Sequence, residues 1–504
     1  MILTGLLAAV RQHTAYAQLL GTAAAAGPPL QLSRAARVPV LATLAQDLAR
    51  PLLVLVARSD RALVLQEELE CWTGSAPLLF SEPNSLFYDR TPRGARALRQ
   101  RMGCLAACSA PAAGTQASRI IIASARALLT RTLPPADFAA HLHVLQAGGN
   151  LPLNQMLASW LAAGYSQETV VVEPGQFCRR GGIIDIWPIT RLQPVRIELF
   201  GDEIERMREF EPGTQRSADL VDSVSIVPAR EALPANGPEL AARLQAAWPG
   251  AQAVADTGAS SSISEDLMRL AAGVPFPELE FYLPWLHPES ATLLDYMPAD
   301  CLVVADDWEV FEDTVQEFEE QALELRAEQI AARQLPSDAP APHVSWSDLQ
   351  DQLSTMPLVI LGGQQREAAA SGLAADFAPG PRLGGQIPPL VDLLHKLRAD
   401  GDHVVIVSRQ AARLAELWGE HAPYHAPVEL VDFVPQAGSA LFVQGALAEG
   451  WVLRLEPQTN GAAEKRLHLL TDAEIFGWSR PEPRQLTLRR AAAAAPESAF
   501  GIAQ

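Results

Sequence analysis

The sequence of 504 residues has little positive charge, few cysteines and no long apolar run. Its 39 Lys and Arg stand against 58 Asp and Glu, so the formal net charge is −19. Because binding to duplex DNA depends on Lys and Arg that neutralise phosphates, the chain as a whole is a poor candidate for sequence-independent DNA binding. Any basic site must be local, and proteins are the better default partners.

The five cysteines are scattered and odd in number, which fits reduced cytoplasmic thiols better than a disulfide framework. No His or Cys near Cys104 and Cys108 completes a four-ligand site, so we expect no metal and no cofactor. No apolar run reaches the roughly 18 residues that span a bilayer. Residues 1–30 lack the positively charged start of a signal peptide. These absences predict a cytoplasmic protein.

The sequence also lacks the motif G-x-x-x-x-G-K-[ST], whose glycine-rich loop and Lys hold nucleotide phosphates. The corresponding loop region reads GPPLQLSRAAR (27–37), with no Lys and no glycine-rich cradle. Asp306 and Asp307 end the apolar run CLVVADD, which resembles a Walker B strand whose carboxylate would hold Mg²⁺. The alternative is a pair of carboxylates favoured at a helix N-terminus by the helix dipole. We therefore expect a degenerate, non-functional Walker B-like pair and no catalysis.

The order of apolar runs and helical patterns predicts an α/β protein. PLLVLVA (51–57) and RIIIA (119–123) are predicted buried strands, each followed by a helical pattern, and this alternation is typical of a parallel sheet. A long acidic helical pattern follows Asp307. The Pro/Ala-rich stretch around 336–343 indicates a linker to a small α/β domain over 344–477. The Ala-rich segment 478–504 is typical of a disordered tail.

Strand patterns dominate the segment from 130 to 217. Along PVRIELF (194–200), Val195, Ile197 and Leu199 share one face, which is typical of a core. Arg196, Glu198 and Phe200 share the other face, and Arg and aromatic residues are enriched at protein–protein hot spots. Arg180 precedes the neighbouring predicted strand, where two glycines permit a tight turn. The alternative interpretation is a solvated face whose arginines balance local acids.

The register of the hairpin around Gly201 and Asp202 stays open at this point. A two-residue turn would place Glu198 opposite Glu205, which is a repulsive pair. A three-residue loop would place Glu198 opposite Arg206 instead.

Residues 175–217, GQFCRRGGIIDIWPITRLQPVRIELFGDEIERMREFEPGTQRS, resemble the second domain shared by the excinuclease component UvrB and the transcription-repair coupling factor family. FPELEFYLPWL (276–286) and LLDYMPADCLVVADD (293–307) resemble the next part of the same module. TDAEIFG (471–477) and the order of segments favour the coupling factors. The resemblance runs from about residue 15 to about residue 480.

The resemblance implies a degenerate helicase-like, RecA-type parallel-sheet domain formed by residues 1–129 and 218–335. An α+β domain of the UvrB domain 2 type, residues 130–217, would be inserted into it. In this family the inserted domain binds the damage-recognition protein UvrA, and the family's contact positions match Arg180, Arg196 and Phe200. RNA polymerase and double-stranded DNA bind to family domains that are missing here, as is the ATP-dependent translocase.

The implied function is a non-catalytic adaptor that recruits UvrA to DNA lesions where RNA polymerase has stalled. The rival interpretation is a UvrB-like, ATP-dependent helicase or excinuclease component. Such a component needs a P-loop near its N-terminus, and the loop region at 27–37 does not supply one.

Overall fold

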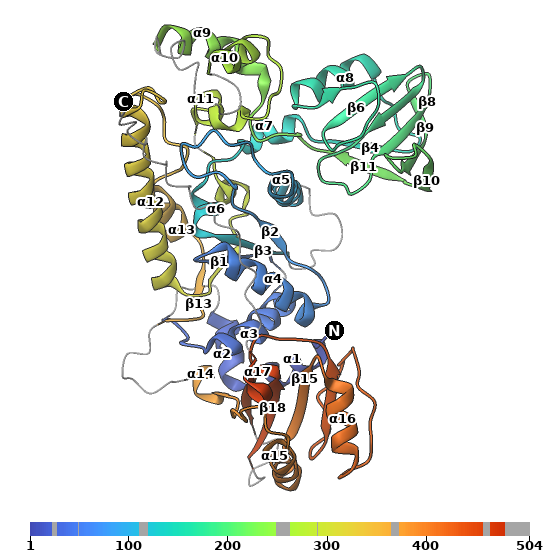
Figure 1. The fold of residues 1–504 in the computed structure, drawn as a ribbon, viewed down its shortest axis with the longest axis vertical. Helices are drawn as coiled ribbons and strands as arrows, with labels where there is room; N and C mark the ends of the chain where they lie inside the picture. The colour runs from blue at the N-terminus through green and yellow to red at the C-terminus, as the bar shows by residue number, and fades with distance from the viewer. Residues whose placement is uncertain are drawn as a thin grey trace, which may run out of the picture.

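The computed structural model describes residues 1–22, 28–48, 50–109, 119–247, 263–289, 291–363, 372–456 and 464–478. The tail predicted from 478 onward lies outside these ranges, apart from its first residue. The molecule is elongated, with a central sheet, an inserted β-rich domain at the upper right and a second α/β unit at the bottom (Figure 1). Within the described ranges, no helix is long and apolar enough to cross a membrane.

The central sheet confirms the predicted α/β class. Its five strands have the order β13-β12-β1-β3-β2 and pair in parallel throughout. The strands β1 and β3 are buried along their whole length, as expected for apolar runs covered by helices on both faces. The strands are β1 (Leu52–Val56), β2 (Leu78–Phe80), β3 (Ile120–Ser124), β12 (Leu302–Ala305) and β13 (Leu358–Ile360).

Helices cover both faces of this sheet. One apolar cluster joins alternate residues of β1 to α3 and α4, and a second joins the other residues of β1 to α5, α6, α12 and α13. The helices of this unit are α1 (Leu7–Arg11), α2 (Thr14–Thr22), α3 (Arg34–Asp47), α4 (Ser59–Thr73), α5 (Ala95–Ser109), α6 (Ala125–Leu129), α7 (Pro135–Ala140), α12 (Trp308–Ala331) and α13 (Trp346–Ser354).

The boundary predicted at 336–343 differs from the structure. β13 lies beyond that stretch, yet Val359 pairs in parallel with Val304 of the central sheet. Leu335 and Ala339 are buried in an apolar cluster with Tyr88, so the Pro/Ala-rich stretch packs on the first unit. Composition cannot distinguish such a packed loop from a linker, because the burial of its few apolar residues depends on distant partners.

The inserted domain contains a six-stranded sheet of order β10-β9-β8-β7-β6-β5 and a two-stranded ribbon of β11 and β4. The ribbon pairs Val224 with Leu145, so the domain extends past the end predicted at 217. α8 (Leu153–Ala162) contributes Trp160 to the core beneath the sheet. The strands are β4 (His143–Gln146), β5 (Ser166–Gln167), β6 (Gln176–Arg180), β7 (Ile183–Ile186), β8 (Val195–Phe200), β9 (Glu203–Phe210), β10 (Ser217–Leu220) and β11 (Ser223–Ile226).

A buried ionic cluster ties the inserted domain to the central unit. Glu231, just after the domain, accepts from Arg101 Nε at 2.8 Å and from Thr132 Oγ1 at 2.6 Å, and it pairs with Arg93. Above this junction lies a small helical unit with its own apolar core (Figure 1). Its helices are α9 (Gly237–Ala247), α10 (Ile263–Ala271) and α11 (Leu283–Leu286).

The last unit is built on a five-stranded sheet of order β14-β17-β18-β15-β16, in which β15 pairs in parallel with both of its neighbours. Its helices α15 and α16 pack against β15 through Leu394, Leu414 and Trp418. The elements are α14 (Leu373–Asp376), β14 (Phe377–Pro379), α15 (Ile387–Asp400), β15 (His403–Ser408), α16 (Ala411–Gly419), β16 (Ala440–Gln444), β17 (Trp451–Leu455), β18 (Lys465–Thr471) and α17 (Asp472–Phe476).

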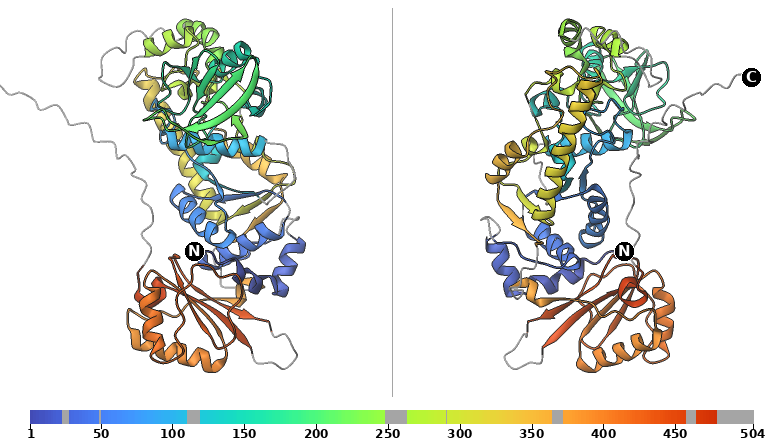
Figure 2. Two further views of the ribbon diagram at one scale, coloured as in Figure 1. Left: turned by 90° about the vertical axis from the view of Figure 1, so that its right-hand side faces the viewer. Right: turned by 60° about the vertical axis from the view of Figure 1, so that its left-hand side comes forward.

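The N-terminus of the chain packs against this last unit. Ile2 forms a parallel bridge with Leu430, and the Gly5 amide donates to Val431 O at 2.9 Å. One apolar cluster runs from α1–α3 to Val405 and Trp451. Figure 2 shows the N-terminal helices lying against the C-terminal sheet. The N-terminal helices and the last described unit therefore share one core.

Candidate functional site

The hairpin of β8 and β9 combines the two predicted registers. Phe200 lies opposite Glu203 across a two-residue turn, as one alternative required. A β-bulge then shifts the register, so that Glu198 lies opposite Arg206, as the other alternative required, and not opposite Glu205. Arg206 Nε lies 2.9 Å from Glu198 Oε2, so the bulge replaces a repulsive pair with an attractive one.

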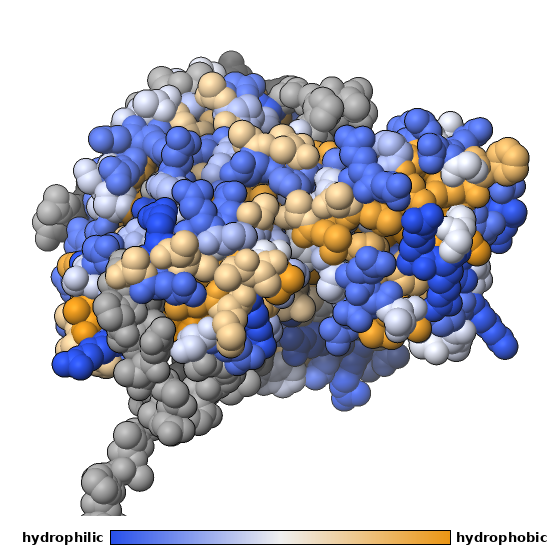
Figure 3. Space-filling view, turned by 90° about the horizontal axis from the view of Figure 1, so that it is seen from above, coloured by the Kyte–Doolittle hydropathy of each residue, from blue (hydrophilic) through white to orange (hydrophobic). Residues whose placement is uncertain are grey.

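The outward face of the inserted sheet carries exposed apolar and basic side chains near this hairpin. Phe200 is 81% exposed, and Ile183 of β7 is 39% exposed. Ile183 lies between Arg180 on β6 and Glu198 on β8 in one row across the sheet. Arg180 is exposed and donates to Thr169 O at 3.0 Å. In the space-filling view from above, the domain at the right shows hydrophobic areas among charged side chains (Figure 3).

Arg196 shares this face but is largely engaged within the protein. Its guanidinium forms a two-pronged ion pair with Asp185, with Nε–Oδ1 at 2.7 Å and Nη2–Oδ2 at 2.8 Å. Nη1 donates to Gln215 O at 3.3 Å, and the group lies over the Phe210 ring at 4.8 Å. The hydrogen bonds with Asp185 raise the pKa of Arg196 above its ordinary value. The Arg196 side chain is only 17% exposed.

A second, smaller core therefore covers part of the outward face. It is formed by Val171, Cys178, Trp187 and Phe210. The alternation of side chains along the strand predicted Arg196 on the outward face, and this is what the structure shows. The alternation could not show that loops would cover that end of the face. The three residues predicted as partner contacts thus differ: Arg180 and Phe200 are exposed, whereas Arg196 belongs to the covered part.

The predicted Walker B-like pair is bound by arginines. Asp306 is buried and accepts from Arg61 Nε at 2.9 Å and from Arg61 Nη2 at 3.0 Å. Arg37 lies 3.4 Å from Asp306 and 3.4 Å from Asp307. Burial alone would raise the pKa of Asp306, but the Arg61 hydrogen bonds and charge, and then Arg37, lower it below the ordinary 3.8. Asp307 accepts from Val310 N at 3.4 Å as the N-cap of α12, as the helix-terminus alternative predicted.

Arg37 comes from the segment that would hold a P-loop. Leu30 N donates to Ile360 O at 2.9 Å, so the chain runs beside β13 before α3 begins at Arg34. The first turn of α3 then directs Arg37 to the carboxylates at the end of β12. Two guanidinium groups thus occupy the surroundings of Asp306, where a nucleotide enzyme would place Mg²⁺ and phosphate. Within the described ranges, no group of three or more His, Cys, Asp or Glu is arranged to hold a metal ion.

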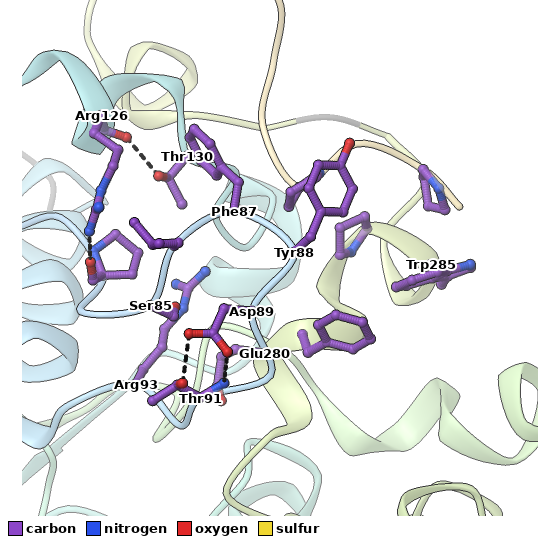
Figure 4. A pocket seen from close by; sticks show the side chains of 16 residues that line it. Ser85, Phe87, Tyr88, Asp89, Thr91, Arg93, Arg126, Thr130, Glu280 and Trp285 are labelled. Carbon is purple, nitrogen blue, oxygen red and sulfur yellow. Dashed lines mark hydrogen bonds between the residues drawn. The ribbon is translucent and has the colours of Figure 1, made fainter. Parts of the chain in front are cut away.

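A hollow of about 50 Å³ beside the loop after β2 is lined by aromatic and proline residues, including Tyr88 and Trp285 (Figure 4). Its polar side chains bond within the protein: Arg126 donates to a backbone carbonyl, and Thr91 Oγ1 donates to Asp89 at 2.8 Å.

A larger hollow of about 340 Å³ lies at the ends of β2 and β3, beside α4 and α5. There Ser81 donates to Gln100 at 2.6 Å and Ser124 donates to Glu82 at 3.2 Å. In both hollows these hydrogen bonds run within the protein, although Arg126 Nε has no hydrogen-bond partner and lies 3.6 Å from Glu82 Oε2. We therefore place the candidate site on the outward face of the inserted sheet.

Comparison with known proteins bears on this face. The UvrB interaction domain family model matches residues 144–231, which include the whole six-stranded sheet. The transcription-repair-coupling factor of Bacillus subtilis is 29% identical over 315 residues, and that of Myxococcus xanthus is 31% identical over 290 residues. The chain is a homologue of the transcription-repair-coupling factors. The factor of Mycobacterium tuberculosis is 27% identical over 503 residues, or 92% of this chain.

The chain spans 25%, 23% and 39% of the lengths of these three coupling factors, respectively. The alignments with the Bacillus subtilis and Myxococcus xanthus factors cover 59% and 55% of this chain. The UvrB interaction match ends at the Glu231 junction and begins in β4, so it coincides with the inserted unit. Sequence reasoning missed Asp185 and Ile183 on this unit. On β7, Asp185 is the one acidic residue among isoleucines, and this is the feature of the sequence that could have indicated a buried ion pair.

Proposed function

We propose that this chain binds UvrA through the outward face of its UvrB interaction domain. The observation that carries the proposal is the exposure of Phe200, 81%, on the same face as the exposed Arg180. Aromatic side chains are enriched at the buried centres of protein interfaces, where they act as anchors. Arg180 adds a planar group of donors for a carboxylate of the partner.

In this proposal the chain acts as a non-catalytic adaptor in transcription-coupled repair, bringing UvrA to lesions at stalled RNA polymerase. The central unit is a degenerate helicase-like domain, and Asp306 and Asp307 are its non-functional Walker B-like pair. Support comes from Arg61 and Arg37, which neutralise the carboxylates without a metal. Contacts with RNA polymerase and double-stranded DNA belong to parts of the coupling factors that this chain does not match.

The rival, a UvrB-like ATP-dependent helicase or excinuclease component, requires a nucleotide at the end of β12. The P-loop motif is absent from the sequence, and α3 presents Arg37 at the place where phosphates would bind. No observation favours the rival function.

A titration of UvrA against Phe200→Ala tests the proposal. Removing a buried anchor from an interface costs about 2 kcal/mol, or roughly thirtyfold in affinity. Leu192→Ala is the matched control, because Leu192 is 75% exposed in the same domain but lies before β8, at the end of the strand remote from Phe200. Circular dichroism checks that both variants fold. Equal affinity of wild type and folded Phe200→Ala would refute the proposed interface.

A further inference from the structure

Asp185 is a buried carboxylate at the centre of the covered part of the outward face. It is 2% exposed, and its two oxygens accept from Nε and Nη2 of Arg196 at 2.7 and 2.8 Å. Cys178 Sγ lies 3.8 Å from Asp185 Oδ2. A buried charge is stable only when it is paired, so Asp185 and Arg196 depend on each other for their placement.

The ion pair holds a loop that covers the sheet. Arg196 Nη1 donates to Gln215 O at 3.3 Å, and Gln215 sits at a φ of +61°, which a non-glycine residue adopts only when its surroundings hold it there. The Gln215 side chain in turn donates to Pro212 O at 2.7 Å and to Val171 O at 3.4 Å. The carboxylate of Asp185 is therefore linked through Arg196 to the loop at 211–216.

The second loop leads to the exposed basic residue. Val171 lies two residues from Thr169, whose carbonyl accepts from Arg180 Nη2 at 3.0 Å. Val171 itself is fully buried in the small core with Phe210. A continuous set of contacts thus runs from Asp185 through Arg196, the two loops and the small core to the guanidinium of Arg180.

We infer that Asp185 is a positioning residue for the docking surface: by holding Arg196, it fixes the two loops that orient Arg180. This inference rests on the proposed binding of UvrA. Asp185 is too buried to touch a partner itself, so its effect on binding must pass through the groups that it holds. Its role differs from that of Phe200, which is exposed and would contact the partner directly.

Asp185→Asn is the deciding variant, because it removes the charge with little change in shape and leaves both arginines in place. We expect UvrA binding to weaken tenfold or more, and Asp185→Glu, which restores the carboxylate, to regain part of the affinity. Glu209→Gln is the matched control: it breaks the ion pair between Arg191, in the loop before β8, and Glu209, which lies in the same sheet opposite the core residue Val195. This control should bind UvrA as the wild type does.

Arginine side-chain NMR of the full chain supplies a readout that does not involve UvrA. With ¹⁵N-labelled Arg, the Nε–H signal that disappears in Arg196→Lys identifies Arg196. In wild type this signal should be protected from solvent exchange, because Asp185 accepts from Nε, and in Asp185→Asn it should shift and exchange faster. An unchanged Arg196 signal in Asp185→Asn would overturn the inference.

The outcomes separate the two proposals. If Phe200→Ala binds UvrA normally, the proposed interface is wrong; if Phe200→Ala binds weakly but folded Asp185→Asn binds normally, only the positioning role is wrong. Should Asp185→Asn fail to fold, Gln215→Gly decides, since glycine adopts the φ of +61° and removes only the side-chain links to Val171 and Pro212. Unchanged affinity of Gln215→Gly would then overturn the positioning role.

Discussion

Replacing Asp306 by Asn should destabilise the fold strongly, whereas the same change at Asp307 should not. Asp306 is 7% exposed and carries the negative charge that balances Arg61 and Arg37. Those two side chains are only 11% and 13% exposed. Asp306→Asn therefore leaves buried guanidinium groups without their main counter-charge, since Asn offers one neutral acceptor.

The expected magnitude follows from this burial. Breaking a buried ion pair by removing one partner costs about 3–5 kcal/mol, a large part of the roughly 5–15 kcal/mol that stabilises a typical domain. Asp307 is more exposed, at 23%, and its other role is to cap α12. Asn is as good an N-cap as Asp, so Asp307→Asn should cost less than about 1 kcal/mol.

Urea unfolding at neutral pH, followed by circular dichroism, compares the three proteins. The pKa of Asp306 lies below its ordinary 3.8, so its stabilising effect is complete above that pH and is lost as the pH falls through the folded-state value. The difference in free energy of unfolding between wild type and Asp306→Asn should therefore disappear as the pH falls below about 4. If Asp306 belonged to a nucleotide site instead, ATP with Mg²⁺ would bind the folded wild type and stabilise it by mass action.

Two results would refute this reasoning. Equal stability of Asp306→Asn and wild type at neutral pH would show that the two arginines do not depend on the carboxylate. Stabilisation of the wild type by MgATP, or phosphate release that is lost in Asp306→Asn, would show a working nucleotide site in place of a structural ion pair.

Two further predictions concern stability. Gly5→Ala should destabilise the chain by about 3 kcal/mol or more, because a Cβ at this position would lie 2.0 Å from the Phe433 backbone nitrogen. Gly21 lies in a helix where an added Cβ would meet nothing within 4 Å, so Gly21→Ala should be neutral or stabilising by up to about 1 kcal/mol. Urea unfolding of both variants checks this, and equal midpoints would contradict it. Burial, with Arg131 adding to it, lowers the pKa of His343 to about 4 from 6.5, so the neutral side chain's stabilisation is complete above pH 6.5 and is lost as the pH falls towards 4. Between pH 7 and pH 4, His343→Gln should therefore lose less free energy of unfolding than wild type, by as much as about 3 kcal/mol. Urea unfolding of both proteins at the two pH values measures this, and an equal loss in both would exclude the effect.

The structure adds to what the sequence predicted about the docking face. Alternation along PVRIELF correctly separated Val195 and Ile197, which are fully buried, from Phe200, which is exposed. It could not predict that a bulge would bring Arg206 opposite Glu198, because a bulge forms through the competition of two strands for register. It also could not show that Arg196 is held by Asp185, since the two residues meet only when β7 and β8 pair.

Local patterns determined the strand and helix positions in the core. The runs at 51–57 and 120–123 are apolar along their whole length, and a strand with this pattern is stable only when helices cover both faces, so the parallel sheet could be predicted from the sequence. The missing P-loop motif was equally readable, because it is a contiguous set of residues.

Only the tertiary structure decided which segments belong together. β13 joins the central sheet from beyond a Pro/Ala-rich stretch, and residues at the N-terminus pack on the last unit more than 400 positions away. Arg37 and Arg61 reach Asp306 from two different helices. Hydrogen bonds between strands and ion pairs between helices depend on the spatial meeting of residues that are far apart in the chain, and no local periodicity records such meetings.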